Sequence, residues 1–322
     1  MMTTLLYAFI LALVVSLAAG TLVISKLKKL KARQSIRIEG PARHQAKAGT
    51  PTMGGIIILL ALVISVIAFA HYSIETGLAL FLTLGYGAIG FVDDFIKAVK
   101  KRNLGLTAKQ KLLAQFTIAA VFCYIISAFL HVSTAVWIPF TAIYVDLGFY
   151  YYVLAFFVLM GTTNAVNLTD GLDGLAAGSS AITAVAYTVI SVALGYTDMA
   201  LFSVALTGAC LGFLFYNQYP AKVFMGDTGS LAIGGAFAAL AVLTKTELLF
   251  ILLGGLFVLE ALSVIIQVVS FKTRGVRVFK MSPIHHHFEL SGWSEMKVVA
   301  VFWLTAAIFA IISIIIVMYK AI

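Results

Sequence analysis

The stretch Leu78–Lys97 reads LALFLTLGYGAIGFVDDFIK, an apolar run that ends in two neighbouring aspartates and a lysine. Because about 20 apolar residues are enough for a helix to cross the hydrocarbon core of a bilayer, the run predicts a membrane-spanning helix. Two adjacent acids, Asp93 and Asp94, are a costly way to end such a helix. We therefore expect their carboxylates to hold something at the membrane surface.

The whole chain is more apolar than a soluble domain: of its 322 residues, 62% are hydrophobic and 11% are charged. This composition predicts an integral membrane protein. Alternation of polar and apolar residues is absent, which argues against a β-barrel. We predict one all-α, polytopic domain over residues 1–322, whose first helix is retained because it lacks a basic leader and a small-residue cleavage site. About ten segments are candidate transmembrane helices: 3–25, 53–71, 76–92, 112–131, 149–166, 174–194, 199–216, 229–244, 247–271 and 298–319.

The basic residues lie almost entirely in alternate connections between these segments. All but Lys245 and Lys320 of the 22 Lys and Arg residues fall in four connections: 26–52, 93–111, 217–228 and 272–297. The positive-inside rule places these connections in the cytoplasm and both termini on the extracytoplasmic side. The net charge of +9 is therefore a topology signal that also suits anionic lipids and phosphorylated substrates, and we expect no nucleic-acid partner.

Five aspartates gather at the predicted cytoplasmic ends of the helices, with glycines and amides around them. Clustered carboxylates repel one another unless a cation neutralises them, and Mg²⁺ favours carboxylate oxygens together with substrate phosphates. The alternative is that the acids only cap helix ends. Five acids in three separate connections favour a functional site. They are Asp93, Asp94, Asp170, Asp173 and Asp227.

Three consecutive histidines, His285–His287, lie in another basic connection. They cannot all face one way on a helix, so we expect one or two to point into the site. Zinc binding remains open, but the cysteines and a helical His-x-x-x-His spacing are missing. Contact with phosphate or proton handling near neutral pH suits imidazole better. Lys97 lies four residues after Asp93, which predicts an ion pair on one helix face or a phosphate contact.

Five motifs carry a family resemblance that runs over essentially the whole chain. They are GTPTMGG (49–55), DDFIK (93–97), NAVNLTDGLDGL (164–175), FMGDTGS (224–230) and SPIHHHFELSGW (282–293). Together they resemble the phospho-N-acetylmuramoyl-pentapeptide transferase family, which belongs to the polyprenyl-phosphate hexose-1-phosphate transferases. The histidine motif favours this branch over the one that acts on UDP-N-acetylglucosamine.

The resemblance implies a single transferase domain in the bacterial plasma membrane, with its active site facing the cytoplasm. The implied reaction transfers phospho-N-acetylmuramoyl-pentapeptide from its UDP-linked donor to undecaprenyl phosphate, with Mg²⁺ as cofactor. Its products are UMP and lipid I, the first lipid-linked intermediate of peptidoglycan synthesis in cell wall biogenesis. The oligomeric state is open, a homodimer included.

The resemblance also implies roles for individual residues. Asp227 is the expected principal Mg²⁺ ligand, because it stands at a helix start whose free N–H groups also favour anions. Asp93 or Asp94 is expected to position the acceptor phosphate; an aspartyl-phosphate intermediate is the competing scheme. Phe224 is expected to stack on uracil, unless it is an ordinary interface aromatic.

The remaining expected site residues fall into three groups. The nucleotide side comprises Lys47, Gly171, Leu172, Asp173, Asn217 and Phe224. Asn164 and Asp170 are expected to orient the site. Contacts to phosphates or sugar are expected from Thr52, Lys97, Lys101, Lys109, His285, His286 and His287, although each lysine fits an inside-positive role equally well.

Glu260 is unusual because it lies near the middle of an apolar segment that contains Gly254 and Gly255. We expect this helix to bend and Glu260 to face inward, near the groove for the polyprenyl chain. A multi-span transporter is the competing function, but a transporter would place polar residues near the midplane on several helices. Here Glu260 is the only acid at that depth.

Overall fold

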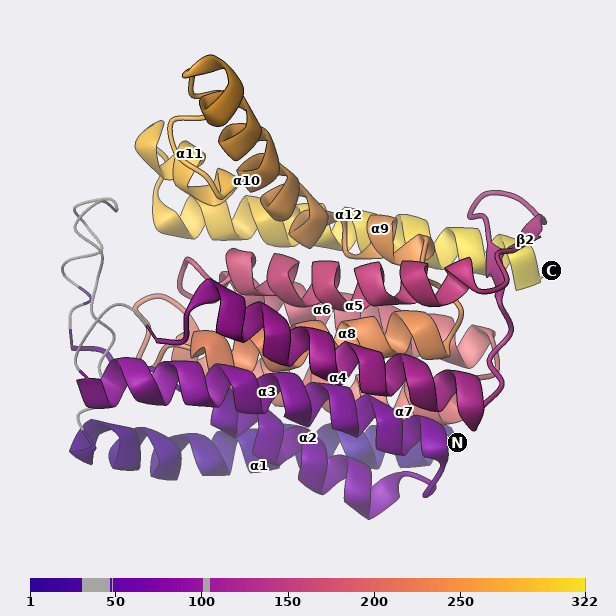
Figure 1. Cartoon of the computed structure of the whole chain (residues 1–322). Coiled ribbons are helices and arrows are strands. Elements are labelled where there is room, and N and C mark those ends of the chain that lie inside the picture. The colour runs from indigo at the N-terminus through magenta and orange to yellow at the C-terminus, as the bar shows by residue number, and fades with distance from the viewer. Residues whose placement is uncertain (31–46, 48, 101–104, 322) are drawn as a thin grey trace.

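The computed structural model describes residues 1–30, 47, 49–100 and 105–321. In this part of the chain, long helices run side by side in a bundle (Figure 1). The helices are α1 (Met2–Lys29), α2 (Gly55–Phe69), α3 (Ile74–Lys100), α4 (Ala108–Ala128), α5 (Tyr150–Thr169), α6 (Leu175–Ala193), α7 (Thr197–Asn217), α8 (Gly226–Leu243), α9 (Leu249–Leu253), α10 (Gly255–Arg274), α11 (Ile284–Leu290) and α12 (Glu295–Ala321). Nine described helices are long and apolar enough to cross a membrane, and α2 is a shorter apolar helix. The prediction of an all-α, polytopic architecture with about ten crossings is confirmed.

Helix α8 forms the centre of the bundle, since every residue from Thr228 to Leu243 is buried. Its small residues allow neighbouring helices to come close. A Cβ atom at Gly235 would lie 2.7 Å from the Tyr86 ring of α3, and one at Gly234 would lie 2.5 Å from Cα of Thr163 in α5. This packing brings the first turn of α8 beside the acidic end of α3.

The apolar segment predicted over residues 247–271 is divided into two helices, because α9 ends at Leu253 and α10 begins at Gly255. Glycine destabilises the interior of a helix, which explains a break at Gly254 and Gly255. The predicted bend at this glycine pair is confirmed. Beyond the break, α10 leads away from the bundle (Figure 1). Glu260 on α10 is nevertheless fully buried, so it faces inward as predicted.

Two short elements were not predicted. Strands β1 (Ala135–Trp137) and β2 (Tyr144–Asp146) form an antiparallel hairpin, and three-residue strands are too short to give a recognisable alternation. The histidine segment was expected to be a loop but forms α11. The three histidines do not share one face, because His285 is buried whereas His286 and His287 are partly exposed.

The sidedness of the bundle is a testable prediction. Both termini lie at one end, and α11 lies at the other (Figure 1). Single cysteines at Ser73, between α2 and α3, and at Ser282, before α11, should therefore be labelled from opposite sides of the membrane. The background should lack the two native cysteines, Cys123 and Cys210. With the basic loops in the cytoplasm, Ser73 is the external position. Labelling of both positions from one side would contradict this topology.

Candidate active site

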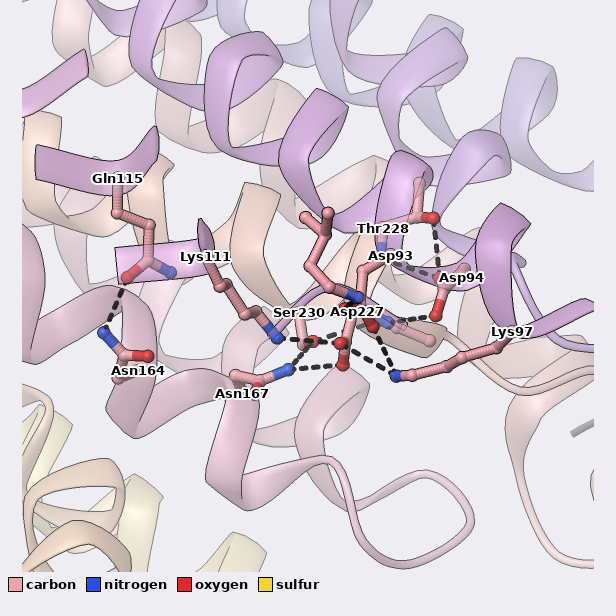
Figure 2. A network of polar contacts seen from close by, with 12 residues as sticks. Asp93, Asp94, Lys97, Lys111, Gln115, Asn164, Asn167, Asp227, Thr228 and Ser230 are labelled. Carbon is pink, nitrogen blue, oxygen red and sulfur yellow. Dashed lines mark hydrogen bonds and ion pairs between the residues drawn. The ribbon is translucent and has the colours of Figure 1, made fainter. Parts of the chain in front are cut away.

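Three carboxylates from two helices meet at the end of the bundle that holds α11. Asp93 and Asp94 stand near the end of α3, and Asp227 stands in the first turn of α8 (Figure 2). Each offers an oxygen atom, and these atoms all lie within 4.8 Å of one another. Gly90 allows this approach, because a Cβ atom there would collide with the backbone of Asp227. The site is therefore built by the tight packing of α3 against α8.

Asp94 caps the beginning of α8. Its Oδ2 atom accepts hydrogen bonds from the backbone N–H of Thr228 at 2.9 Å and from the Thr228 hydroxyl at 2.7 Å. Its Oδ1 atom accepts the backbone N–H of Asp227 at 3.2 Å. These N–H groups were expected to be free for a substrate anion, and that expectation is wrong because Asp94 occupies them. Asp94 thus performs the capping role that the sequence left as an alternative.

Asp93 faces different partners from Asp94. Its Oδ1 atom accepts the backbone N–H of Leu106 at 2.8 Å, which ties the end of α3 to the segment before α4. Its Oδ2 atom lies 2.5 Å from Nζ of Lys97, so the predicted ion pair four residues apart is confirmed. The same ammonium group lies 3.1 Å from Oδ2 of Asp227. Lys97 therefore bridges the acids of the two helices.

A second lysine at the cluster was missed by the sequence analysis. Nζ of Lys111 lies 2.8 Å from Oδ2 of Asp227 (Figure 2). A capping box of Thr107 and Gln110 fixes where α4 begins and so sets the direction in which Lys111 points. The sequence analysis named Lys109 instead, which is exposed. Residues two apart on a helix point about 200° apart, so only one of the two lysines can face Asp227.

Amide side chains from α5 complete the cluster. Asn167 donates hydrogen bonds through Nδ2 to Oδ1 of Asp227 at 2.9 Å and to the Ser230 hydroxyl at 2.8 Å. Asn164, one turn earlier, donates to Oε1 of Gln115 on α4 at 3.1 Å. Only Asn164 was named from the sequence. Asn164 and Asn167 are three residues apart, so both amides lie on one face of the helix. This spacing was the feature of the sequence that could have identified Asn167 as a site residue.

The connection between α5 and α6 carries Asp170. Burial of its carboxyl group, together with the nearby carboxylates of Asp227 and Asp94, raises the pKa of Asp170 to about 8. The backbone amide of Gly226 acts in the opposite direction. At neutral pH this carboxyl group therefore favours its protonated form. A divalent cation brought to the cluster would favour the ionised form.

A second polar cluster joins three distant parts of the chain. Nζ of Lys47 lies 2.7 Å from Oδ1 of Asp173 and 2.5 Å from Oε1 of Glu295, in the first turn of α12. The same glutamate oxygen accepts the backbone N–H of Asp173 at 2.8 Å. The structure thus brings together Lys47 and Asp173, two residues expected on the nucleotide side. Glu295 was missed because no sequence pattern links it to either partner.

Three other residues were expected on the nucleotide side: Asn217, Leu172 and Phe224. Asn217 accepts the backbone N–H of Gly174 at 3.1 Å and donates to the carbonyl of Val223 at 3.0 Å. Leu172 is buried in an apolar cluster with residues of α6, α10 and α12. Phe224 is partly exposed.

Thr52 is buried close to Gly226 at the beginning of α8. Gly226 has φ +72°, and a Cβ atom there would lie 2.7 Å from Oγ1 of Thr52 and 2.5 Å from Oδ2 of Asp94. Only glycine fits both this backbone conformation and this space. Lys101 lies outside the described residues, so its expected phosphate contact stays a prediction.

His285 and Gly171 meet on one side of the Asp170–Gly174 connection. Nδ1 of His285 lies 3.0 Å from Oε1 of Glu260, and both side chains are buried. A Cβ atom at Gly171 would collide with Nε2 of the same ring. The other two histidines have different partners: Nδ1 of His286 lies 2.9 Å from Oε2 of Glu289, and Nδ1 of His287 accepts the backbone N–H of Lys280.

The donor set at the three carboxylates fits a divalent cation. Carboxylate oxygens are the ligands that Mg²⁺ prefers, and the remaining positions are normally filled by water and substrate phosphate. In this structure the ammonium groups of two lysines lie at this cluster of three acids. Among the described residues, Asp93, Asp94 and Asp227 form the group of side chains that could hold a metal ion.

Comparisons with known proteins agree with the motifs. The family description Glycosyl transferase family 4 matches residues 76–245, and Phospho-N-acetylmuramoyl-pentapeptide-transferase signature 1 matches residues 47–59. The chain is 56% identical over 313 residues to the phospho-N-acetylmuramoyl-pentapeptide-transferase of Geobacillus sp. (strain WCH70), covering 95% of this chain and 96% of that protein. It is 51% identical over 313 residues to the protein of the same name from Bacillus subtilis (strain 168), covering 96% of each. Similarity at this level over nearly the full length places the chain in a family: it belongs to the phospho-N-acetylmuramoyl-pentapeptide-transferases.

Proposed function

We propose that this membrane protein transfers phospho-N-acetylmuramoyl-pentapeptide from its UDP-linked donor to undecaprenyl phosphate, giving lipid I and UMP. The observation that carries the proposal is the cluster of Asp93, Asp94 and Asp227 with two lysines at one end of a membrane-spanning bundle. A lipid acceptor and a water-soluble donor can meet there. Family membership supplies the chemical identity of the two substrates.

The transfer is a phosphoryl displacement. An oxygen of the acceptor phosphate attacks the phosphorus that carries the sugar, and a new P–O bond forms. The bond from this phosphorus to the bridging oxygen breaks, and that oxygen leaves with UMP. Such a reaction depends on in-line positioning and on stabilising the charge that develops on the phosphate oxygens. The ammonium groups of Lys97 and Lys111, both beside Asp227, are suited to that charge.

Asp227 is proposed as the principal ligand of Mg²⁺, with Asp93 beside it. Mg²⁺ bound there would neutralise the donor diphosphate and the departing UMP. Asn167 holds one oxygen of Asp227, which orients the carboxylate. Because Asp94 is engaged in capping α8, Asp93 is the better placed of the pair to position the acceptor phosphate. An aspartyl-phosphate scheme would use the same carboxylate as a nucleophile.

The donor nucleotide is proposed to lie along the connection Asp170–Gly174. Asp173 lies in this connection, and hydrogen bonds join Lys47 to Asp173 and Asn217 to Gly174. Phe224 is proposed to stack on uracil, since this residue is partly exposed. The ring of His285 lies against Gly171 of the same connection.

The proposed function is tested with purified protein in detergent. The assay combines Mg²⁺, undecaprenyl phosphate and UDP-N-acetylmuramoyl-pentapeptide, and it measures UMP together with the lipid product. UMP release that depends on both substrates and on Mg²⁺ is expected. UDP-N-acetylglucosamine as donor should give no product, and turnover of that sugar would contradict the donor assignment. Light scattering on the same sample gives the oligomeric state, for which a homodimer is the open expectation.

Gly171 gives a prediction on the donor side. Gly171→Ala places a methyl group against Nε2 of His285, so either the ring or the Asp170–Gly174 connection must move. We expect turnover to fall about 10-fold or more while the protein still folds, because small displacements at a site reduce rate strongly. Gly161→Ala on α5 is the matched control, since a Cβ atom there meets nothing within 4 Å. Equal activity of the two variants would contradict the prediction.

A further inference from the structure

Glu260 and His285 form a buried pair, and the proposed function gives Glu260 no role. Glu260 lies on α10, five residues after that helix begins, and its side chain is fully buried. Its Oε1 atom lies 3.0 Å from Nδ1 of His285, whose side chain is 1% exposed. An acid inside a membrane-spanning helix is costly, and such acids usually serve a function. The partner here is a histidine from the motif that reaches the Asp170–Gly174 connection.

The hydrogen bond decides which nitrogen of the ring is available. With Glu260 ionised, its carboxylate can only accept, so Nδ1 of His285 is the protonated ring nitrogen of this pair. The other ring nitrogen, Nε2, is buried and has no hydrogen-bond partner among the described residues. It lies against Gly171. A buried polar atom without a partner is uncommon and requires an explanation.

The α10 side of the pair is linked to the Asp170–Gly174 connection by apolar packing. Leu256, one turn before Glu260, packs in an apolar cluster with Leu172 of the Asp170–Gly174 connection and with Val298 and Phe302 of α12. The position of the glutamate is therefore linked to the connection on which Nε2 of His285 rests. A rigid second partner behind a functional histidine normally fixes both the orientation and the tautomer of the ring.

We propose that Glu260 is a positioning residue for the transfer reaction: it holds the Nδ1–H of His285 and thereby presents Nε2, as a hydrogen-bond acceptor, to a hydroxyl or amide N–H of the bound nucleotide-sugar. This inference rests on the proposed function, because it takes the Asp170–Gly174 connection as the place where the donor lies. Glu260 acts through the histidine and does not touch the substrate. The expectation that Glu260 lies near the groove for the polyprenyl chain stays a prediction.

The competing explanation is that the pair only joins α10 to α11. Substitutions at Glu260 separate the two. Glu260→Leu removes the hydrogen-bond acceptor and replaces it with an apolar side chain of similar size. Glu260→Gln keeps an oxygen that accepts from Nδ1. If Glu260 positions the ring, Glu260→Leu should lower kcat about 10- to 100-fold, the usual effect of losing the partner behind a functional histidine. Glu260→Gln should recover a large part of that loss.

A double-mutant comparison tests whether Glu260 acts through His285. His285→Ala should be impaired, and adding Glu260→Leu to it should cause no further loss, because the partner is already gone. Glu247→Gln is the matched control. Glu247 is also a buried glutamate, paired with Tyr151 at 2.7 Å and with Lys245 at 3.1 Å, but it lies beyond the far end of α8. It should retain wild-type turnover. Independent, multiplicative losses at Glu260 and His285 would overturn the proposal.

The tautomer gives a readout that does not need turnover. In full-length protein with ¹⁵N-labelled histidine, the signal of His285 is identified by its loss in His285→Ala. Wild type should show a protonated Nδ1, and Glu260→Leu should shift the proton to Nε2. An unchanged tautomer in Glu260→Leu would overturn the proposal even if activity falls. If the wild-type protein shows the expected tautomer and no transferase activity, the proposed function fails while the Glu260–His285 relation stands.

Discussion

Asp227→Asn is expected to abolish most of the transferase activity, with turnover falling by about 10²–10⁴. Asp227 is the acid that both lysines and Asn167 contact. Asparagine preserves the shape and can still accept from Asn167, but it removes the negative charge that strengthens the binding of Mg²⁺ to a carboxylate oxygen. Metal affinity should therefore fall together with turnover. UMP release measured over a Mg²⁺ titration reports both quantities.

Excess Mg²⁺ distinguishes a weakened metal site from a lost catalytic group. Raising its concentration should restore part of the activity of Asp227→Asn and little of the activity of Asp93→Asn, if Asp93 serves the acceptor phosphate. Asp198→Asn is the control, because Asp198 occupies the first turn of α7 and lies outside the cluster. If Asp93→Asn loses Mg²⁺ as completely as Asp227→Asn, the division of roles is wrong. The three carboxylates are close enough for that outcome.

The helical bundle was predictable because few chain conformations are stable inside a bilayer. Backbone groups in lipid must be satisfied within the element itself, so each long apolar segment becomes a helix. The same physics explains the bend at Gly254 and the inward direction of Glu260. Where the chain leaves the apolar core this constraint ends, and there the sequence analysis missed the β1–β2 hairpin and helix α11.

The site was predictable only as far as its motifs extend. Asp93, Asp94 and Asp227 stand out because acids that end apolar helices are rare. Lys111 and Glu295 carry no such signal, since each is one charged residue in the first turns of a helix. Their importance comes from partners more than 100 residues away. Such pairings depend on how helices pack, and one sequence without packing information does not reveal them.

The capping role of Asp94 leads to the second large effect, which combines activity with stability. Asp94→Asn replaces one accepting oxygen by an amide that can only donate, so either Thr228 or Asp227 loses the partner of its backbone N–H. Leaving one buried donor unpaired costs about 1–3 kcal/mol. The beginning of α8 should therefore loosen, and Asp227 should move with it. We expect a lower melting temperature together with a loss of turnover of about 10²-fold or more.

The combination of the two losses identifies the role of Asp94. Thr228→Val removes the hydroxyl that binds Asp94 but leaves both backbone N–H groups paired, so it should reduce stability and activity far less. Asp227→Asn should reduce activity with little change in melting temperature, because the Asp227 side chain contacts Lys97, Lys111 and Asn167 and not the helix cap. If Asp94→Asn melts like wild type and yet loses its activity, Asp94 acts on the substrates or the metal. The geometry favours the other outcome, since both of its oxygens are already bound to the first turn of α8.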